Sequence, residues 1–261
     1  MLTWIIVGLS IILGVVSAVH WQRHGQSIRK GFGYTFHWWA LGDMGAGMLI
    51  CFIAMMGIFI VEWLLGGIRV ISIPFNLASL NDNLFILIFG AVFEEVFFRS
   101  LLLSGLVVVL GGRKWPAILI SAAVFGIVHI NNPGASYVSA FGNALGGIIY
   151  GIAFLGGQNI WFPLGLHFSW NFSQGPLLGF PVSGENFGGL IMQEVTGSDL
   201  LTGGAYGPEA GLVGMTFRFV IMAMVIAYLQ WRCGGQGDTK TLEFPIKVYA
   251  NPAKLRSGHN L

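Results

Sequence analysis

Residues 84–110 read LFILIFGAVFEEVFFRSLLLSGLVVVL, and this stretch decides the fold class. A helix needs about 20 mostly apolar residues to cross a hydrocarbon core of about 30 Å, and the stretch exceeds that length. Three ionisable residues, Glu94, Glu95 and Arg99, nevertheless lie near its middle. The stretch therefore predicts a transmembrane helix that carries charged groups inside the membrane.

The composition of the whole chain agrees with a membrane protein. Charged residues make up 9% of the 261 residues, whereas a soluble domain carries about 25%. Hydrophobic residues reach 55%, and the mean hydropathy is +0.75. These values exclude a soluble globule, a disordered chain, a coiled coil and a nucleic-acid-binding protein with a broad basic face. Two cysteines, Cys51 and Cys233, exclude a disulfide framework.

Hydropathy predicts an all-α, polytopic transmembrane helical bundle with about seven spans. The spans are expected at residues 2–19, 40–65, 84–110, 115–130, 135–155, 160–178 and 211–231. The Gly-rich stretch 180–208 between the last two is expected to be a loop. We thus predict a single transmembrane domain, residues 1–231, with a catalytic core at about 84–184, followed by a polar tail, residues 232–261.

The distribution of basic residues predicts the orientation in the membrane. Most of the 13 Lys and Arg residues fall after the first, third and seventh predicted spans, which all end on the same side. Loops rich in Lys and Arg stay in the cytoplasm. The N-terminus is therefore expected outside and the C-terminal tail in the cytoplasm.

The charges in the third predicted span suggest a division of roles. Glu95 and Arg99 are four residues apart, so they share a helix face and can form an ion pair. Glu94 points about 100° away from Glu95 and is not matched by Arg99. One glutamate then supports the site and the other is a reactive base. The alternative is that all three residues form a structural polar cluster.

Two further spans carry polar residues that are able to face the same cavity. His129 closes the fourth span, and His167 and Asn171 lie four residues apart in the sixth. Packing and hydrogen bonding between helices are the alternative roles. Glu94 is expected near mid-membrane, His129 towards the outer end of its span and His167 inward of the centre. One shared cavity therefore requires helices that tilt or begin irregularly.

The chemistry that suits these groups is hydrolysis. A buried carboxylate can take a proton from water, an imidazole can orient that water, and His and Asn can donate hydrogen bonds to an oxyanion. Alternatively, Glu94, His129 and His167 hold a divalent metal such as zinc that activates water. The chain contains no His-Glu-x-x-His pair and no Gly-x-Ser-x-Gly elbow.

The three segments together resemble the CPBP family of intramembrane proteases. Glu94-Glu95-x-x-x-Arg99, Phe125-x-x-x-His129 and His167-x-x-x-Asn171 match its three motifs in order and spacing. The family is also called Abi and includes the type II CAAX prenyl endopeptidases. The sequence around His167, running on to Pro181-Val182-Ser183-Gly184, resembles a bacterial branch. The resemblance spans roughly residues 84–184.

This resemblance implies an endopeptidase that cuts a membrane-associated protein or peptide, in the plasma membrane of a bacterium. Glu94 would activate water with help from His129, while His167 and Asn171 would stabilise the oxyanion. Glu95 and Arg99 would support the site. The family's use of a metal is disputed, so the cofactor stays open. One departure is Ser100, where the family usually has glycine after the arginine.

Two other functions remain open from the sequence. One is a non-catalytic membrane protein that protects against a toxin or assists secretion by binding a partner. The other is an ion-coupled or proton-coupled transporter that uses the buried carboxylates. Outside the motifs, Asp43 and Glu62 are expected to reach the membrane interfaces. Asn143 is expected either to pack between helices or to face the same cavity. Arg218 is expected either to pair with an acid, for which Glu209 is the candidate, or to extend towards the interface.

Overall fold

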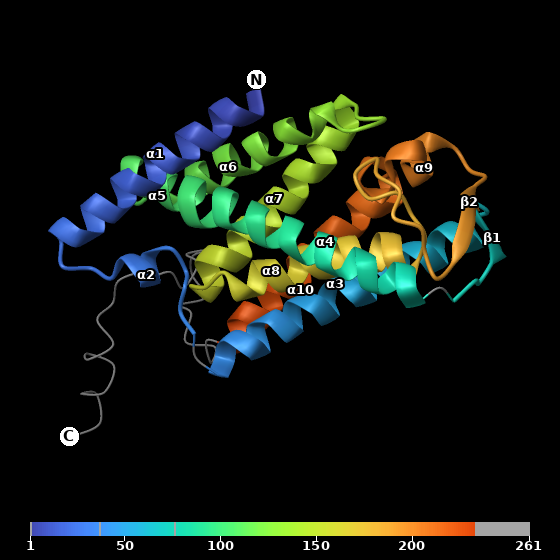
Figure 1. The fold of residues 1–261 in the computed structure, drawn as a ribbon, viewed down its shortest axis with the longest axis horizontal. Helices are drawn as coiled ribbons and strands as arrows, with labels where there is room; N and C mark the ends of the chain where they lie inside the picture. The colour runs from blue at the N-terminus through green and yellow to red at the C-terminus, as the bar shows by residue number, and fades with distance from the viewer. Residues whose placement is uncertain (1, 37, 76, 233–261) are drawn as a thin grey trace.

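The computed structural model describes residues 2–36, 38–75 and 77–232, and these residues fold into a helical bundle (Figure 1). The predicted tail, residues 233–261 with Cys233, lies outside the described residues. The longer helices are α1 (Leu2–Arg23), α3 (Trp38–Leu64), α4 (Leu77–Glu95), α6 (Lys114–Val128), α7 (Tyr137–Gly157), α8 (Trp161–Phe172) and α10 (Leu212–Arg232). Shorter ones are α2 (Ile28–Gly31), η1 (Val96–Leu103), α5 (Ser104–Val109), η2 (His129–Asn131), η3 (Ser173–Leu177), α9 (Asp199–Thr202), η4 (Gly204–Tyr206) and η5 (Pro208–Ala210).

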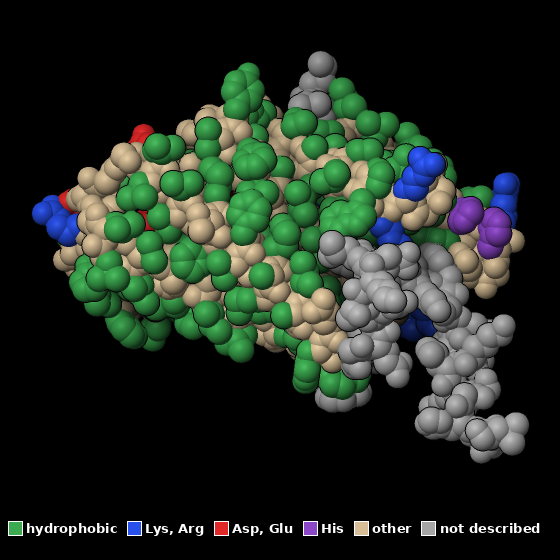
Figure 2. All heavy atoms as spheres, turned by 180° about the vertical axis from the view of Figure 1, so that it is seen from behind, with side chains coloured by type: hydrophobic (Ala, Val, Ile, Leu, Met, Phe, Trp, Pro, Cys, Tyr) green, Lys and Arg blue, Asp and Glu red, His purple; other side chains and the backbone are tan. Residues whose placement is uncertain are grey.

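The all-α polytopic fold is confirmed. Five helices of the described part of the chain are long and apolar enough to cross a membrane: α1, α3, α6, α7 and α10. Large apolar side chains cover the face of the molecule shown in Figure 2, while charged and histidine side chains gather towards its two ends. Such a surface belongs in lipid rather than in water. The protein is therefore an integral membrane protein.

The two remaining predicted spans are helical but irregular. Residues 84–110 belong to a longer helical run, which α4 begins at Leu77 and which continues through η1 and α5. The predicted start at residue 84 is too late because the polar run before it looks like a loop. In the structure the amide of Asn83 is satisfied by donating to the carbonyl of Phe187, at 2.6 Å.

Two π-helical segments follow directly on the polar motifs. The segment η1 begins one residue after Glu95, and η3 begins two residues after Asn171. A π-helical turn holds an extra residue relative to an α-helix, and such turns are frequent at functional sites. Each motif thus lies where its helix changes its winding.

Helix α8 occupies the centre of the bundle, between α3, α4 and α7. Its contact with α3 is close because glycine leaves room for the two backbones. A Cβ atom on Gly47 of α3 would lie 2.7 Å from the carbonyl oxygen of Phe162 and 2.8 Å from the amide nitrogen of Leu166. His167, next along α8, is consequently held inside the protein.

A short two-stranded sheet and the segment that follows α8 cover one end of the bundle (Figure 1). Strand β1 (Ile68–Ser72) pairs antiparallel with β2 (Met192–Val195), and Arg69 forms an ion pair with Glu194. The stretch 180–208, predicted as a loop, also contains α9 and η4. Its glycines allow it to fold back onto the bundle, where it closes one side of the candidate site.

Candidate active site

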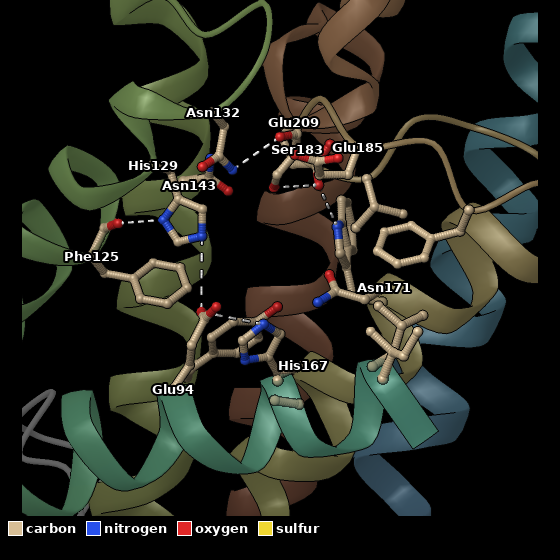
Figure 3. A pocket seen from close by; sticks show the side chains of 18 of the residues that line it. Glu94, Phe125, His129, Asn132, Asn143, His167, Asn171, Ser183, Glu185 and Glu209 are labelled. Atoms are coloured by element: carbon tan, nitrogen blue, oxygen red, sulfur yellow. Dashed lines mark hydrogen bonds and ion pairs between the residues drawn. The ribbon is translucent and has the colours of Figure 1, made fainter. Parts of the chain in front are cut away.

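Glu94 lies close to polar side chains from two other parts of the bundle, the end of α6 and helix α8 (Figure 3). It lies at the end of α4, and its Oε2 atom is 3.8 Å from Nε2 of His129 and 3.8 Å from Nε2 of His167. Neither distance is a direct hydrogen bond. The carboxylate side chain is about one-third exposed, whereas the neighbouring Glu95 is fully buried.

His129 reaches Glu94 from the end of α6. The helix stops at Val128, and His129 opens the 3-10 turn η2. Its Nδ1 lies 2.7 Å from the carbonyl oxygen of Phe125. Because a carbonyl only accepts hydrogen bonds, Nδ1 carries the proton, and a neutral His129 presents an unprotonated Nε2 towards Glu94. The irregular helix end resolves the difference in depth that the sequence suggested.

His167 is fixed by a chain of charged side chains. Its Nδ1 donates to Oε1 of Glu95 at 2.8 Å, and Oε2 of Glu95 lies 3.2 Å from Nε of Arg99. The guanidinium of Arg99 lies over the ring of Phe125, 4.6 Å from its centroid. The ion pair expected from the i, i+4 spacing is thus formed, inside the protein. The ring of Tyr150 stacks on the imidazole of His167, with a centroid distance of 4.9 Å.

Asn171 lies one turn beyond His167 and lines the same cavity (Figure 3). Its amide points towards the space that Glu94 faces. The structure therefore brings together all four residues expected to carry the chemistry, Glu94, His129, His167 and Asn171, and places the expected supporting pair, Glu95 and Arg99, behind His167.

The cavity in front of these residues has a volume of about 210 Å³ and mixed polar and apolar walls. Asn143 packs by donating to the hydroxyl of Tyr206 at 2.7 Å, and it also lines this cavity. The side chain of Asn132 donates to the carbonyl of Ser183 at 3.0 Å and ties the loop after α6 to the segment after α8. Asn132 was not singled out from the sequence, because its role depends on this contact between two loops.

A second cavity of about 230 Å³ lies on the other side of Glu94. It shares Glu94, His129 and Asn132 with the first, but its other walls are almost entirely apolar. Residues from α1, α4, η1 and α6 form these walls: Ile6, Val7, Ser10, Phe93, Phe97, Phe98 and Val128. Glu94 and His129 consequently stand between a cavity with mixed walls, which we call the polar cavity, and one with mainly apolar walls, which we call the apolar cavity.

A second group of polar side chains, missed by the sequence analysis, surrounds Glu209 of η5. Its carboxylate, 1% exposed, accepts hydrogen bonds from Trp170 at 3.3 Å, Gln174 at 2.7 Å and Ser183 at 3.3 Å. Burial, reinforced by the nearby charge of Glu209, raises the pKa of Tyr206 to about 12. The sequence signal was an acid in a Gly-Pro turn directly before a hydrophobic span.

Three expectations about charged residues are wrong. Arg218 forms no ion pair with Glu209 and does not extend to the interface: it is buried against the ring of Trp170. Asp43 is buried and pairs with Arg232 at 3.1 Å, while Glu62 is also fully buried. Packing between helices, which hydropathy does not report, accounts for all three.

The three possible metal ligands supply suitable donor types, two imidazoles and a carboxylate. The Nδ1 partners of the imidazoles, a carbonyl and a carboxylate, also resemble the outer-shell partners of metal-bound histidines. As placed, however, no group of three or more His, Cys, Asp or Glu side chains in residues 2–232 that the structure describes is arranged to hold a metal ion. We therefore assign no step of the chemistry to a metal.

Comparison with known families supports the resemblance of the motifs. Residues 76–173, which contain all three motifs, match the family described as type II CAAX prenyl endopeptidase Rce1-like. The segment that carries the three motifs is thus similar to the CPBP family of membrane proteases. No curated protein and no solved structure matches the chain. The matched segment ends just after Asn171, so the cavity walls contributed by residues 182–218 lie beyond it.

Proposed function

We propose that the protein is an intramembrane endopeptidase that hydrolyses a peptide bond of a membrane-associated protein or peptide, with water activated by Glu94. The observation that carries this proposal is the position of the Glu94 carboxylate, 3.8 Å from two imidazole nitrogens and at the wall of two cavities. Those distances leave Oε2 of Glu94 without a direct hydrogen bond, and about one-third of the side chain is exposed. Similarity to a protease family supports the same reaction class.

In the proposed reaction, Glu94 takes a proton from a water molecule while the water oxygen attacks the carbonyl carbon of the substrate. The unprotonated Nε2 of His129 accepts the second hydrogen bond of this water and orients it. The tetrahedral intermediate then collapses, the C–N bond breaks, and the proton held by Glu94 passes to the leaving amine. The reaction consumes one water and produces a carboxylic acid and an amine, and transfer of the acid's proton to the amine gives a carboxylate and an ammonium group.

Asn171 and His167 stabilise the oxyanion of the intermediate. Because Nδ1 of His167 already donates to Glu95, its Nε2 can donate to the oxyanion only when the ring is protonated at both nitrogens. The carboxylate of Glu95 then balances the charge of the imidazolium. This requirement gives Glu95 and Arg99 a positioning and electrostatic role without contact with the substrate.

The two cavities suggest separate routes for the reactants. The apolar cavity beside α1 suits a substrate segment that arrives from the bilayer, and the polar cavity suits water. Ser183 and Glu185, which line the polar cavity, belong to the segment that the distribution of basic residues predicts outside. We therefore propose that water reaches Glu94 from the outer side of a bacterial plasma membrane.

The test compares protein termini in membranes from cells that carry either the native chain or Glu94→Gln at matched expression. New termini that appear only with the native chain establish proteolysis and name a substrate. Glu62→Gln is the control, because Glu62 is a glutamate within a helix of the bundle but lines neither of the two cavities. Identical termini for the native chain and Glu94→Gln, with an unchanged phenotype, would refute the proposal and favour a non-catalytic protective or secretory role.

A further inference from the structure

Arg218 of α10 lies in the wall of the polar cavity that also contains Glu94. Its side chain is buried, and its guanidinium lies over the indole ring of Trp170, 3.6 Å from the ring centroid. Nη1 donates to the hydroxyl of Tyr150 at 3.4 Å. A glycine makes this position possible, because a Cβ atom on Gly146 would lie 2.6 Å from Nη1. The side chains of Trp170 and Tyr150 thus hold the guanidinium, the absence of a side chain on Gly146 leaves room for it, and no opposite charge among the described residues contacts it.

This lack of a carboxylate partner sets Arg218 apart from three other arginines. Arg99 pairs with Glu95, Arg232 with Asp43 and Arg69 with Glu194. In the part of the chain that the structure describes, no carboxylate oxygen lies within 4.0 Å of a nitrogen of Arg218, and its Nε makes no hydrogen bond. Burial of a charge without an opposite charge costs free energy, so the described cavity lacks a negatively charged group beside Arg218.

The nearest candidate partner, Glu209, is already engaged. Its two carboxylate oxygens accept hydrogen bonds from Trp170, Gln174 and Ser183. These three neutral donors hold Glu209 at the indole N–H of Trp170, whereas Arg218 lies over the face of the same ring, and the charge of Arg218 stays available to the cavity. An anionic group that enters the cavity therefore meets an arginine that is already oriented.

We propose that Arg218 forms a subsite for a carboxylate group of the substrate, an inference that rests on the proposed endopeptidase function. The planar guanidinium binds a carboxylate through parallel hydrogen bonds. The ring of Tyr150 links this subsite to the site of reaction, because it stacks on His167 while its hydroxyl contacts Arg218. The carboxylate consequently lies within a few residues of the bond that is cut.

Two sources supply such a carboxylate: the free C-terminus of the substrate, or an Asp or Glu side chain near the cleaved bond. Three fluorescent probes distinguish them: dansyl-Leu-Leu-Leu with a free carboxylate, the same peptide with a C-terminal amide, and dansyl-Leu-Asp-Leu-amide. Binding is measured to the full-length Glu94→Gln protein in lipid nanodiscs, so that cleavage does not interfere.

We expect at least one carboxylate probe to bind about 10-fold more tightly than the all-amide probe, because hydrogen bonds between charged groups are the stronger class. Tight binding of the free acid identifies the C-terminus, and tight binding of the Asp peptide identifies a side chain. Adding Arg218→Gln should abolish the preference, Arg218→Lys should retain part of it, and the control Arg69→Gln should leave it unchanged. Thermal unfolding verifies that each variant is folded.

Equal affinities for the three probes, including no binding of any, would overturn the proposal, as would a preference that survives Arg218→Gln. Where Arg218→Gln fails to fold, Arg218→Lys decides, since lysine keeps the charge but loses the planar pair of donors; an unchanged preference in that variant refutes the subsite. None of these results bears on whether the native chain cuts its substrate through Glu94. The subsite and the proteolysis can therefore fail separately.

Discussion

The two adjacent glutamates should respond to the same isosteric substitution in opposite ways. Glu94→Gln removes the proposed base but breaks no ion pair with a lysine or arginine, because the carboxylate only faces two imidazoles and the cavities. Loss of a general base lowers the rate by about 10²–10⁴-fold. We therefore expect cleavage to fall by at least about 100-fold, while the thermal unfolding temperature stays unchanged.

Glu95→Gln should destabilise the protein instead. The change leaves Arg99, 1% exposed, without its carboxylate 3.2 Å away. Removing one partner of a buried ion pair costs about 3–5 kcal/mol. At about 2–4 °C per kcal/mol for a domain of this size, even the lower figure corresponds to roughly 6–12 °C in unfolding temperature. The neutral amide still contacts His167, so some cleavage remains.

A double variant separates the ion pair from the contact with His167. In Glu95→Gln/Arg99→Met the unpaired guanidinium is gone, and stability should recover in part, since apolar side chains replace buried ion pairs at little cost. Cleavage by purified protein and unfolding in the same detergent are the two readouts. The reasoning is refuted if Glu94→Gln destabilises the protein as much as Glu95→Gln does, or if Glu95→Gln leaves the unfolding temperature unchanged.

Other consequences are independent of these two residues. Val7→Trp should fill the apolar cavity beside Glu94 and slow cleavage of substrates with bulky apolar residues several-fold. The control Ile5→Trp, on the exposed side of α1, should leave the cleavage rate unchanged. Equal effects of the two substitutions would argue against substrate entry beside α1. Ser100→Gly should lower the free energy of unfolding by about 1–2 kcal/mol without loss of cleavage. The reason is that the Ser100 hydroxyl donates a 2.8 Å hydrogen bond to the carbonyl of Phe32. An unchanged unfolding curve would contradict this prediction. A cysteine in place of Glu185, in a Cys233→Ser background, should react with an impermeant thiol reagent added to intact cells, and protection from it would place the cavity mouth inside. A zinc chelator should change the cleavage rate by no more than about twofold. Full inhibition that added zinc reverses would show that the mechanism needs a metal, and that the side chains adopt the ligand geometry only when the ion is bound.

Much of the fold follows from hydropathy alone. The apolar runs of α1, α3, α6, α7 and α10 end within a few residues of the predicted spans, because length and the loss of polar residues define such helices. The predicted start of α4 is wrong since hydropathy treats Asn83 as a loop residue, although its amide is bonded inside the protein. The strands β1 and β2 lie far apart in sequence, and each is too short to stand out.

Contacts within one helix followed from residue spacing, whereas the grouping of residues from different helices followed only from the family resemblance. The pairing of Glu95 with Arg99 follows from their i, i+4 spacing, and the structure contains it. The approach of His129 to Glu94 depends on the 3-10 turn that ends α6, and spacing within one helix carries no information about that turn. Depth estimated along ideal, upright helices therefore separated residues that the folded chain brings together.

Arg218 lies outside the segment that matches the family, although it lines the same cavity as Glu94. The matched residues 76–173 contain Glu94 and His167, the groups proposed to react, so the similarity to a protease family supports the proposed chemistry. The wall opposite them comes from residues 182–218, outside that match. A protease chooses its substrate through the groups that contact residues beside the cleaved bond rather than through the base that activates water. In this protein those groups include a buried arginine without a carboxylate partner, and selection of the substrate is therefore expected to depend on the part of the chain in which the family resemblance has already ended.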